Sequence, residues 1–183
     1  MKDKCLIAIV GMPGAGKSEV IGYLTKKGIA SVRFGQITED GLQAQGLPIT
    51  PENEQQFREK LRRDEGMDAY AKKAKSQIDS LLEKESVIAI DGLYSWEEYL
   101  TLTKTYDNIV VVAVVADAQR RYERLSKRMV RPFTRQEARQ RDVAEIEQLH
   151  KAGPIAIADY YLENNEDEKE SLYKKVEEVL NKI

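Results

Sequence analysis

The sequence predicts an α/β fold in which an open parallel sheet is covered by helices on both faces. The first observation is a set of short, continuous apolar runs at 6–10, 87–90 and 109–115, which is typical of strands buried on both sides. The second is that charged, helix-forming segments separate these runs at the distances that parallel crossovers need. The 183 residues suit a single domain covering residues 1–183.

The expected elements alternate along the chain. Thr50 before Pro51 predicts a helix start, because threonine caps helices and proline fits their first position. The most apolar run is expected to be a central strand. The expected strands are 6–10, 29–34, 87–90, 109–115 and 159–162. The expected helices are 16–27, one opening at 51, 67–84, 117–129, 134–151 and 167–182. The stretch of about 35–67 exceeds a simple crossover and predicts a small helical insertion on the substrate side.

Composition excludes several classes of partner. The net charge is only -2 although 33% of residues are charged, and both signs are mixed along the chain. This pattern lacks the basic footprint of nucleic-acid or anionic-membrane binding. No apolar run approaches the roughly 20 residues of a membrane span. A single cysteine, Cys5, suits a reducing compartment, so we expect a cytoplasmic protein.

A phosphate-binding loop follows the first strand. The chain matches G-x-x-x-x-G-K-[ST] in full, with an apolar strand before it and a helix after it. The matching residues are Gly11, Met12, Pro13, Gly14, Ala15, Gly16, Lys17 and Ser18. Inward-pointing backbone N–H groups and the helix dipole favour phosphate. Lys17 is expected to reach the β- and γ-phosphates and Ser18 to bind Mg²⁺, so the motif predicts a site for ATP with Mg²⁺.

A second carboxylate is expected at the end of a neighbouring strand. Asp91 directly follows the apolar run 87–90 and is the preferred candidate to position Mg²⁺ or the acceptor. Asp117, which follows 109–115, is the competitor. Because a charged helix follows it, we favour a plain N-cap role for Asp117.

Arginines gather in the second half of the chain. Arg124 and Arg128 are four residues apart and share a helix face, and Arg139 and Arg141 follow. As a group they predict a lid that neutralises charge on the transferring phosphoryl group. The competing interpretation is a solvated helix face, with glutamates at 123, 137 and 145 as salt-bridge partners. Arg62, on the helix after Pro51, is a candidate for binding an acceptor phosphate.

Several motifs in order give the chain a family resemblance. They are GMPGAGKSEV at 11–20, LRRDEG at 61–66, IDG at 90–92, RYERLSKR at 121–128 and ADYY at 158–161. Together they resemble the adenylate-kinase-related proteins of the P-loop nucleotide kinase superfamily, with dephospho-CoA kinase a near relative. The resemblance spans nearly the whole chain.

The resemblance implies a three-layer P-loop NTPase fold. Its five parallel strands would stand in the order 2-3-1-4-5, with a helical acceptor-side region and a short lid at about 120–141. It implies that Gly11, Gly16, Lys17 and Ser18 bind ATP and Mg²⁺, and that Arg124 and Arg128 open the lid. Arg139 and Arg141 match the later lid arginines more loosely, and Arg62 matches an acceptor-side arginine. Arg62, Arg139 and Arg141 are therefore expected to bind the acceptor.

Two positions depart from the family pattern. Glu39 and Tyr94 stand where the family has arginines that hold the acceptor. A charge-assisted phosphate contact contributes about 1.5–3 kcal/mol, so the two changes weaken the expected acceptor site.

We expect a nucleotide kinase, monomeric or homodimeric, that acts on a small-molecule nucleotide acceptor. The second hypothesis is an ATP-binding sensor or partner module with little turnover. A GTP-driven switch is less favoured, since no N-K-x-D element follows an apolar strand.

Overall fold

Five parallel strands form the centre of the protein. The computed structural model describes residues 4–129 and 132–183. The strands are β1 (Cys5–Val10), β2 (Ala30–Arg33), β3 (Val87–Asp91), β4 (Ile109–Val115) and β5 (Tyr160–Glu163). They stand in the order β2-β3-β1-β4-β5, which confirms the order that the resemblance implied. The middle position belongs to β1, while β4 lies between β1 and β5. The most apolar strand is therefore interior but not the middle one.

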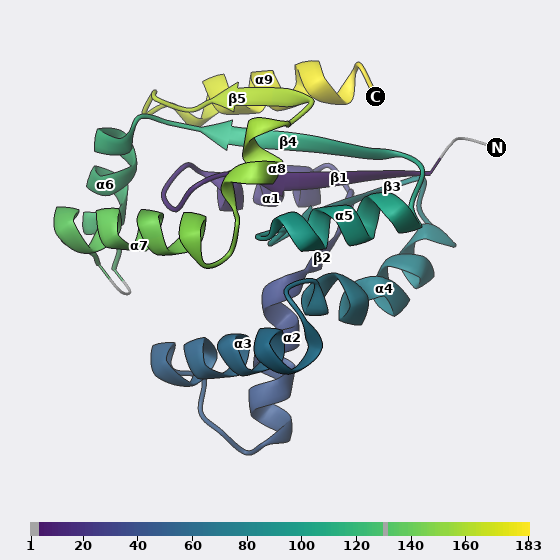
Figure 1. The fold of residues 1–183 in the computed structure, drawn as a ribbon. Coiled ribbons are helices and arrows are strands. Elements are labelled where there is room, and N and C mark those ends of the chain that lie inside the picture. Colours follow the sequence, from purple (N-terminus) through teal and green to yellow (C-terminus); the bar gives the residue numbers. More distant parts are fainter. Residues whose placement is uncertain (1–3, 130–131) are drawn as a thin grey trace.

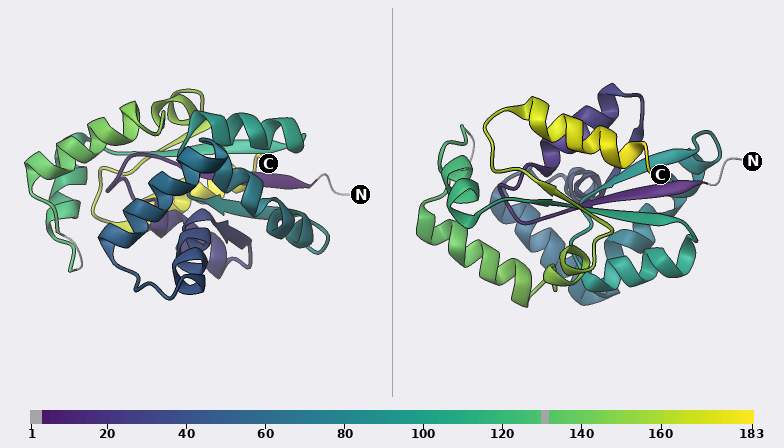
Figure 2. Two further views of the ribbon diagram at one scale, coloured as in Figure 1. Left: turned by 60° about the horizontal axis from the view of Figure 1, so that its bottom comes forward. Right: turned by 90° about the horizontal axis from the view of Figure 1, so that it is seen from above.

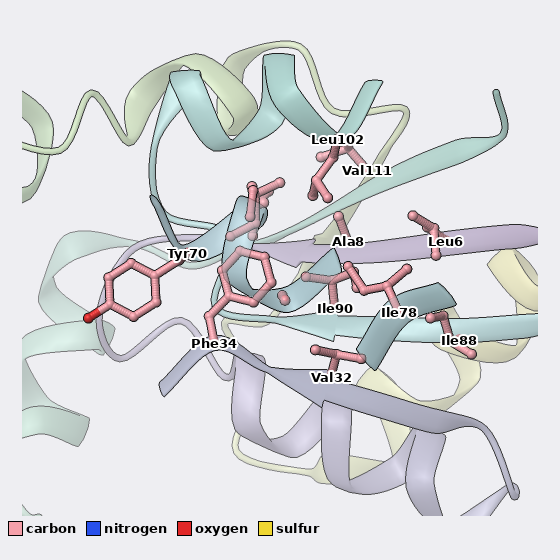
Figure 3. Close-up of a cluster of buried hydrophobic side chains, with 14 of the residues drawn as sticks. Leu6, Ala8, Val32, Phe34, Tyr70, Ile78, Ile88, Ile90, Leu102 and Val111 are labelled. Carbon is pink, nitrogen blue, oxygen red and sulfur yellow. The ribbon is translucent and has the colours of Figure 1, made fainter. Parts of the chain in front are cut away.

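Residues of β1 alternate between two separate apolar cores. Leu6 and Ala8 face one core, which the helices α4 (Ala69–Leu82) and α5 (Trp96–Thr105) cover. Figure 3 shows this core, with Ile78 and Leu102 packed over strand residues. Ile7 and Ile9 face the other core, covered by α1 (Lys17–Lys26) and α9 (Lys169–Leu180). The short α8 (Ala152–Ala156) packs on the α5 side. The layers are thus helices, sheet and helices (Figures 1 and 2).

Two helices form the insertion expected after the second strand. They are α2 (Phe34–Ala44) and α3 (Pro51–Glu65), and they extend away from the sheet (Figure 1). The Thr50 side chain accepts a hydrogen bond from the Asn53 N–H at 3.2 Å, which confirms the expected helix start. The helices meet so closely that a Cβ built on Gly41 would lie 2.1 Å from the Phe57 ring.

Helix α5 was not expected from the sequence. Its N-terminus carries a capping box, in which the Ser95 hydroxyl accepts from the Glu98 N–H and the Glu98 carboxylate accepts from the Ser95 N–H. This S-x-x-E pattern was the available signal. The segment 92–108 separates β3 from β4 and contained no expected element, and α5 occupies most of it.

The expected lid region corresponds to α6 (Ala118–Ser126) and the first half of α7 (Arg135–Glu147). Residues 130–131 of that region lie outside the described part. Asp117 stands at the N-cap position of α6, but its side chain makes no capping hydrogen bond. The expected N-cap position is therefore right and its expected hydrogen bond is not formed. Within the described residues, no helix has both the length and the apolarity needed to cross a membrane.

Candidate active site

Glycines shape the phosphate loop between β1 and α1. Gly11 has φ +143°, and a Cβ there would lie 2.3 Å from the Val114 carbonyl oxygen of the neighbouring strand. Gly16 has φ +110°, and a Cβ would lie 2.2 Å from the amide nitrogen of Asn164. The Asn164 amide in turn donates to the Ala15 carbonyl at 2.7 Å. Only glycine fits at positions 11 and 16, because Val114 and Asn164 leave no room for a Cβ.

Lys17 lies folded over the loop. Its ammonium donates to the carbonyl oxygens of Gly11 at 2.7 Å and Met12 at 3.2 Å. Burial and the nearby positive charge of Lys151 together lower the pKa of Lys17 to about 7, against the raising effect of Glu145 and Asp91. A phosphate bound to the loop would replace these neutral oxygens with charged ones and favour the ammonium form.

A cavity of about 570 Å³ opens beside the loop at the carboxyl ends of the strands. From the loop it is lined by Pro13, Gly14, Gly16, Lys17 and Ser18. Opposite these lie Arg33, Asp91 and Tyr94, and the lid helices contribute Arg124, Arg128 and Arg141. Ligands of open parallel sheets bind at this edge. Of the expected loop residues, Gly11, Met12 and Ala15 do not line the cavity. The carbonyls of Gly11 and Met12 accept from Lys17, and that of Ala15 accepts from the Asn164 amide.

Asp91 brings an unengaged carboxylate to the cavity. It ends β3, which pairs with β1 and so lies directly beside the phosphate loop. Among residues 4–129 and 132–183 its oxygens accept no hydrogen bond and form no ion pair. Burial raises the pKa of Asp91, although the charges of Lys17 and Arg33 oppose this. The carboxylate and the Ser18 hydroxyl are both oxygen donors that suit Mg²⁺, whose remaining positions phosphates and water fill.

The arginines of the lid helices divide into two kinds. Arg124 donates to the carbonyl oxygens of Asn164 and Glu166, both at 2.8 Å, and so reaches the cavity from α6. Arg121 is buried instead. It donates twice to the Asp142 carboxylate, at 2.9 and 2.6 Å, and once to the Pro13 carbonyl at 3.1 Å. This contact ties α6 and α7 to the phosphate loop, which makes Arg121 a positioning residue.

Two arginines expected to bind the acceptor lie outside the cavity. Arg62 is 8% exposed and forms an ion pair with the fully buried Glu98 at 3.2 Å, with its guanidinium over the Tyr70 ring. The pair joins α3 to α5. Arg139 is exposed on α7 and lines a different, shallow depression. The structure therefore gives Arg62 a structural contact and places Arg139 away from the cavity, because its helix turns that face outward.

Three cavity residues escaped the sequence reasoning. Arg33 is the last residue of β2, Lys151 lies between α7 and α8, and Asn164 follows β5. Lys151 is 2% exposed and pairs with Glu145, which also accepts from Arg141 at 3.0 Å. Position just after a strand was the available signal for Arg33 and Asn164. Nothing in the local sequence distinguishes Lys151 from the other lysines.

Comparison with known proteins agrees with this architecture. A family model described as an AAA domain matches residues 7–148. A UPF0200 protein of Thermococcus kodakarensis is 34% identical over 185 residues, which covers 97% of this chain and 100% of the relative. A UPF0200 protein of Thermococcus gammatolerans is 35% identical over 182 residues, covering 97% of this chain and 95% of the relative.

Solved kinases share the fold. Shikimate kinase from Bacteroides thetaiotaomicron superposes with a TM-score of 0.63 at 15% identity, covering 97% of this chain and 98% of that one. A sugar kinase from Janibacter superposes with a TM-score of 0.56 at 15% identity, covering 98% and 95% of the two chains. At this identity the similarity shows a common P-loop kinase fold.

Proposed function

Because the chain belongs to the AAA-domain family and to the UPF0200 proteins, we propose that it is an ATP-dependent phosphotransferase. It would move the γ-phosphoryl group of ATP to a nucleotide or nucleotide-like small molecule. One observation carries the proposal. A single cavity brings together the phosphate-loop Lys17, the unengaged Asp91 carboxylate and the lid arginines. Phosphoryl transfer needs these groups, since its catalysis consists mostly of positioning and charge stabilisation.

Each group has a role that its position supports. Lys17 would leave the Gly11 and Met12 carbonyls and contact the β- and γ-phosphates. Arg124, Arg128 and Arg141 would face the oxygens of the transferring group, where negative charge is spread. The bond from the γ-phosphorus to the β–γ bridging oxygen breaks as the bond to the acceptor oxygen forms, and ADP leaves. No covalent enzyme intermediate is required.

Asp91 and Ser18 are the groups that would hold Mg²⁺. When bound, the ion would supply positive charge beside the phosphates of ATP. Asp91 is equally placed to orient the acceptor, because its carboxylate faces the cavity beside Tyr94 and Arg33. Small-molecule acceptors are also what the shikimate and sugar kinases of similar fold are named for.

The second candidate function is an ATP-binding module with little turnover. It is favoured by Glu39 and Tyr94, which stand where the related nucleotide kinases have acceptor-binding arginines. Under this alternative the phosphate loop would bind ATP and the rest of the cavity would bind no acceptor.

An ADP-release assay separates the two. The assay supplies Mg²⁺ and ATP with each of AMP, CMP, UMP, GMP, their deoxy forms, dephospho-CoA and shikimate. We expect ADP release that depends on at least one acceptor and is absent in the Lys17→Ala protein. ATP binding by calorimetry without acceptor-dependent release from any of these compounds would contradict the kinase proposal and support the binding module.

A further inference from the structure

The cavity is also lined by two cations outside the phosphate loop, which come from unrelated parts of the chain. Arg33 ends β2, and Lys151 follows α7. The Lys151 ammonium lies 4.6 Å from the centre of the Tyr94 ring, and Arg33 lines the same cavity as Tyr94. Arg33 lies beside Asp91 in the β2–β3 register, three residues before Tyr94. The two cations therefore line one cavity together with Tyr94 and Asp91.

Arg33 is held so that part of its guanidinium stays available. One nitrogen donates to Glu39 at 2.7 Å, and the other donates to Gln36 at 2.7 Å and Glu39 at 2.5 Å. A guanidinium has five N–H groups. Three are used in these bonds, so two remain for a ligand within the described part of the chain.

Lys151 is likewise fixed but incompletely satisfied. Its side chain is 2% exposed, and its ammonium donates to the Glu145 carboxylate. An ammonium has three donors, and among the described residues only Glu145 receives a hydrogen bond from it. Burial lowers the pKa of Lys151 and opposes the raising effect of Glu145. The positive charge of Lys151 is also one of the causes that lower the pKa of Lys17. A second bound anion, in addition to the ATP phosphates, would reduce the repulsion between the Lys17 and Lys151 ammonium groups.

The partners of these cations are the two positions that depart from the related kinases. Glu39 replaces one expected arginine, and it holds Arg33. Tyr94 replaces the other, and its ring contacts Lys151. Each replacement thus recruits a positive charge from another element. The cations of the proposed acceptor site are therefore Arg33 and Lys151, and not arginines at positions 39 and 94.

We propose that Arg33 and Lys151 form the subsite that binds an anionic group of the acceptor, a phosphate or a carboxylate, next to Tyr94. This inference rests on the proposed function, whose acceptor it describes. The proposed acceptor carries an anionic group, and Arg33 and Lys151 bind that group. Glu39 and Glu145 act as positioning residues that hold the two cations in place.

The test uses small probe anions, so it needs neither turnover nor knowledge of the acceptor. The full chain is saturated with Mg²⁺ and a non-hydrolysable ATP analogue, which fills the phosphate loop. Inorganic phosphate or acetate is then titrated and followed by ¹H–¹⁵N NMR at the Arg33 Nε–H and the Tyr94 amide. The two anions distinguish a phosphate from a carboxylate preference.

We expect saturable shifts in the wild-type protein with at least one of the anions. Arg33→Gln and Lys151→Met, followed at the Tyr94 amide, should each weaken binding by at least about tenfold, the effect of losing one charge-assisted contact. Arg139→Gln removes an exposed arginine outside the cavity and serves as the matched control, with binding unchanged within about twofold. The Lys151→Met change leaves Glu145 without its lysine. If this protein fails to fold, the double variant Lys151→Met with Glu145→Gln is used instead.

Two results would overturn the subsite. One is the absence of a saturable shift in the wild-type protein with both anions, and the other is equal binding by the wild-type and variant proteins. The proposed function fails separately. A protein that binds anions here but releases no ADP with any acceptor keeps the subsite and loses the kinase role. Wild-type KM for an acceptor in both variants keeps the kinase role and removes the subsite.

Discussion

The two ends of the cavity hold their cations in different ways. At the nucleotide end, Lys17 and Arg124 rest on neutral carbonyl oxygens of Gly11, Met12, Asn164 and Glu166. At the acceptor end, Arg33 is paired with Glu39, while Lys151 and Arg141 share Glu145. Within residues 4–129 and 132–183, Lys17 and Arg124 form no ion pair, whereas the charges of Arg33, Lys151 and Arg141 are partly balanced by carboxylates.

This difference teaches how one cavity can treat two anions differently. A carbonyl oxygen is a weaker partner for a cation than a carboxylate, so incoming phosphates displace it readily. A carboxylate keeps its cation oriented but reduces the net attraction for a ligand. We therefore expect the nucleotide end to provide most of the electrostatic attraction and the acceptor end to provide selectivity.

Removing Lys17 should break the nucleotide end most severely. Lys17→Ala is expected to lower kcat by at least about 10²- to 10³-fold, because a charge on the transferring phosphates is lost. The melting temperature should stay near that of the wild type, since Lys17 bonds only to loop carbonyls. Lys26→Ala, an exposed lysine at the end of the same helix, is the control. Transfer at the wild-type rate would refute the site assignment.

Arg62 tests whether the acceptor end includes the α3 arginine. Arg62→Met should reduce the free energy of unfolding by about 3 kcal/mol, because Glu98 is left buried without its cation. Adding Glu98→Gln should restore part of the loss. Urea denaturation measures both, with the exposed Arg63→Met as the neighbouring control. A normal unfolding free energy with a raised KM for the acceptor would return Arg62 to the acceptor site.

Arg124 tests whether an arginine of the lid helices acts on the transferring phosphoryl group. Arg124→Ala should lower kcat by about ten- to thirtyfold and raise the KM for ATP by less, because its charge acts mainly on the transferring group. Steady-state kinetics gives both values. Arg120→Ala is the matched control, since that side chain is on the same helix and pairs with Glu123 and Asp167. An unchanged kcat would assign Arg124 to the solvated face.

The smallest expected effect is a pH dependence of ATP binding. The pKa of Lys17 is lowered to about 7, so the free protein loses this charge as the pH rises above that value. Bound phosphates favour the ammonium, so ATP binding at pH 8 should take up about one proton. For a pKa of about 7, the affinity should fall by about fivefold between pH 7 and pH 8. Calorimetry in buffers of different ionisation enthalpy measures the uptake, which should disappear in Lys17→Met. Equal uptake in both proteins would assign the proton elsewhere.

The nucleotide end was predictable because its chemistry is local. Eight consecutive residues from Gly11 to Ser18 form the loop, and flanking elements are set by their own apolar patterns. Asp91 was predictable as well, since a residue that ends a strand next to β1 must reach the same edge of the sheet. Helix α5 was missed although the Ser95–Glu98 capping box marks its start.

The acceptor end was less predictable because its charges meet only after folding. Arg62 and Arg139 looked like phosphate ligands in the sequence, but α3 packs on α5 and α7 turns one face outward, so neither reaches the cavity. Lys151 is far from Tyr94 in sequence and contacts it because α7 passes over the end of the sheet.

The sequence by itself determined the parallel α/β fold, the phosphate loop and the position of Asp91 at the end of a strand, because strand burial and glycine conformation are encoded by short patterns. The strand order was implied by the family resemblance. Only the tertiary structure decided which cations line the cavity. Charged side chains of one type look alike in a sequence, and their partners are chosen by helix orientation and by the burial of Glu98, Glu145 and Asp142. The pairing of Arg33 with Glu39 and of Lys151 with Glu145 is therefore a property of the folded chain.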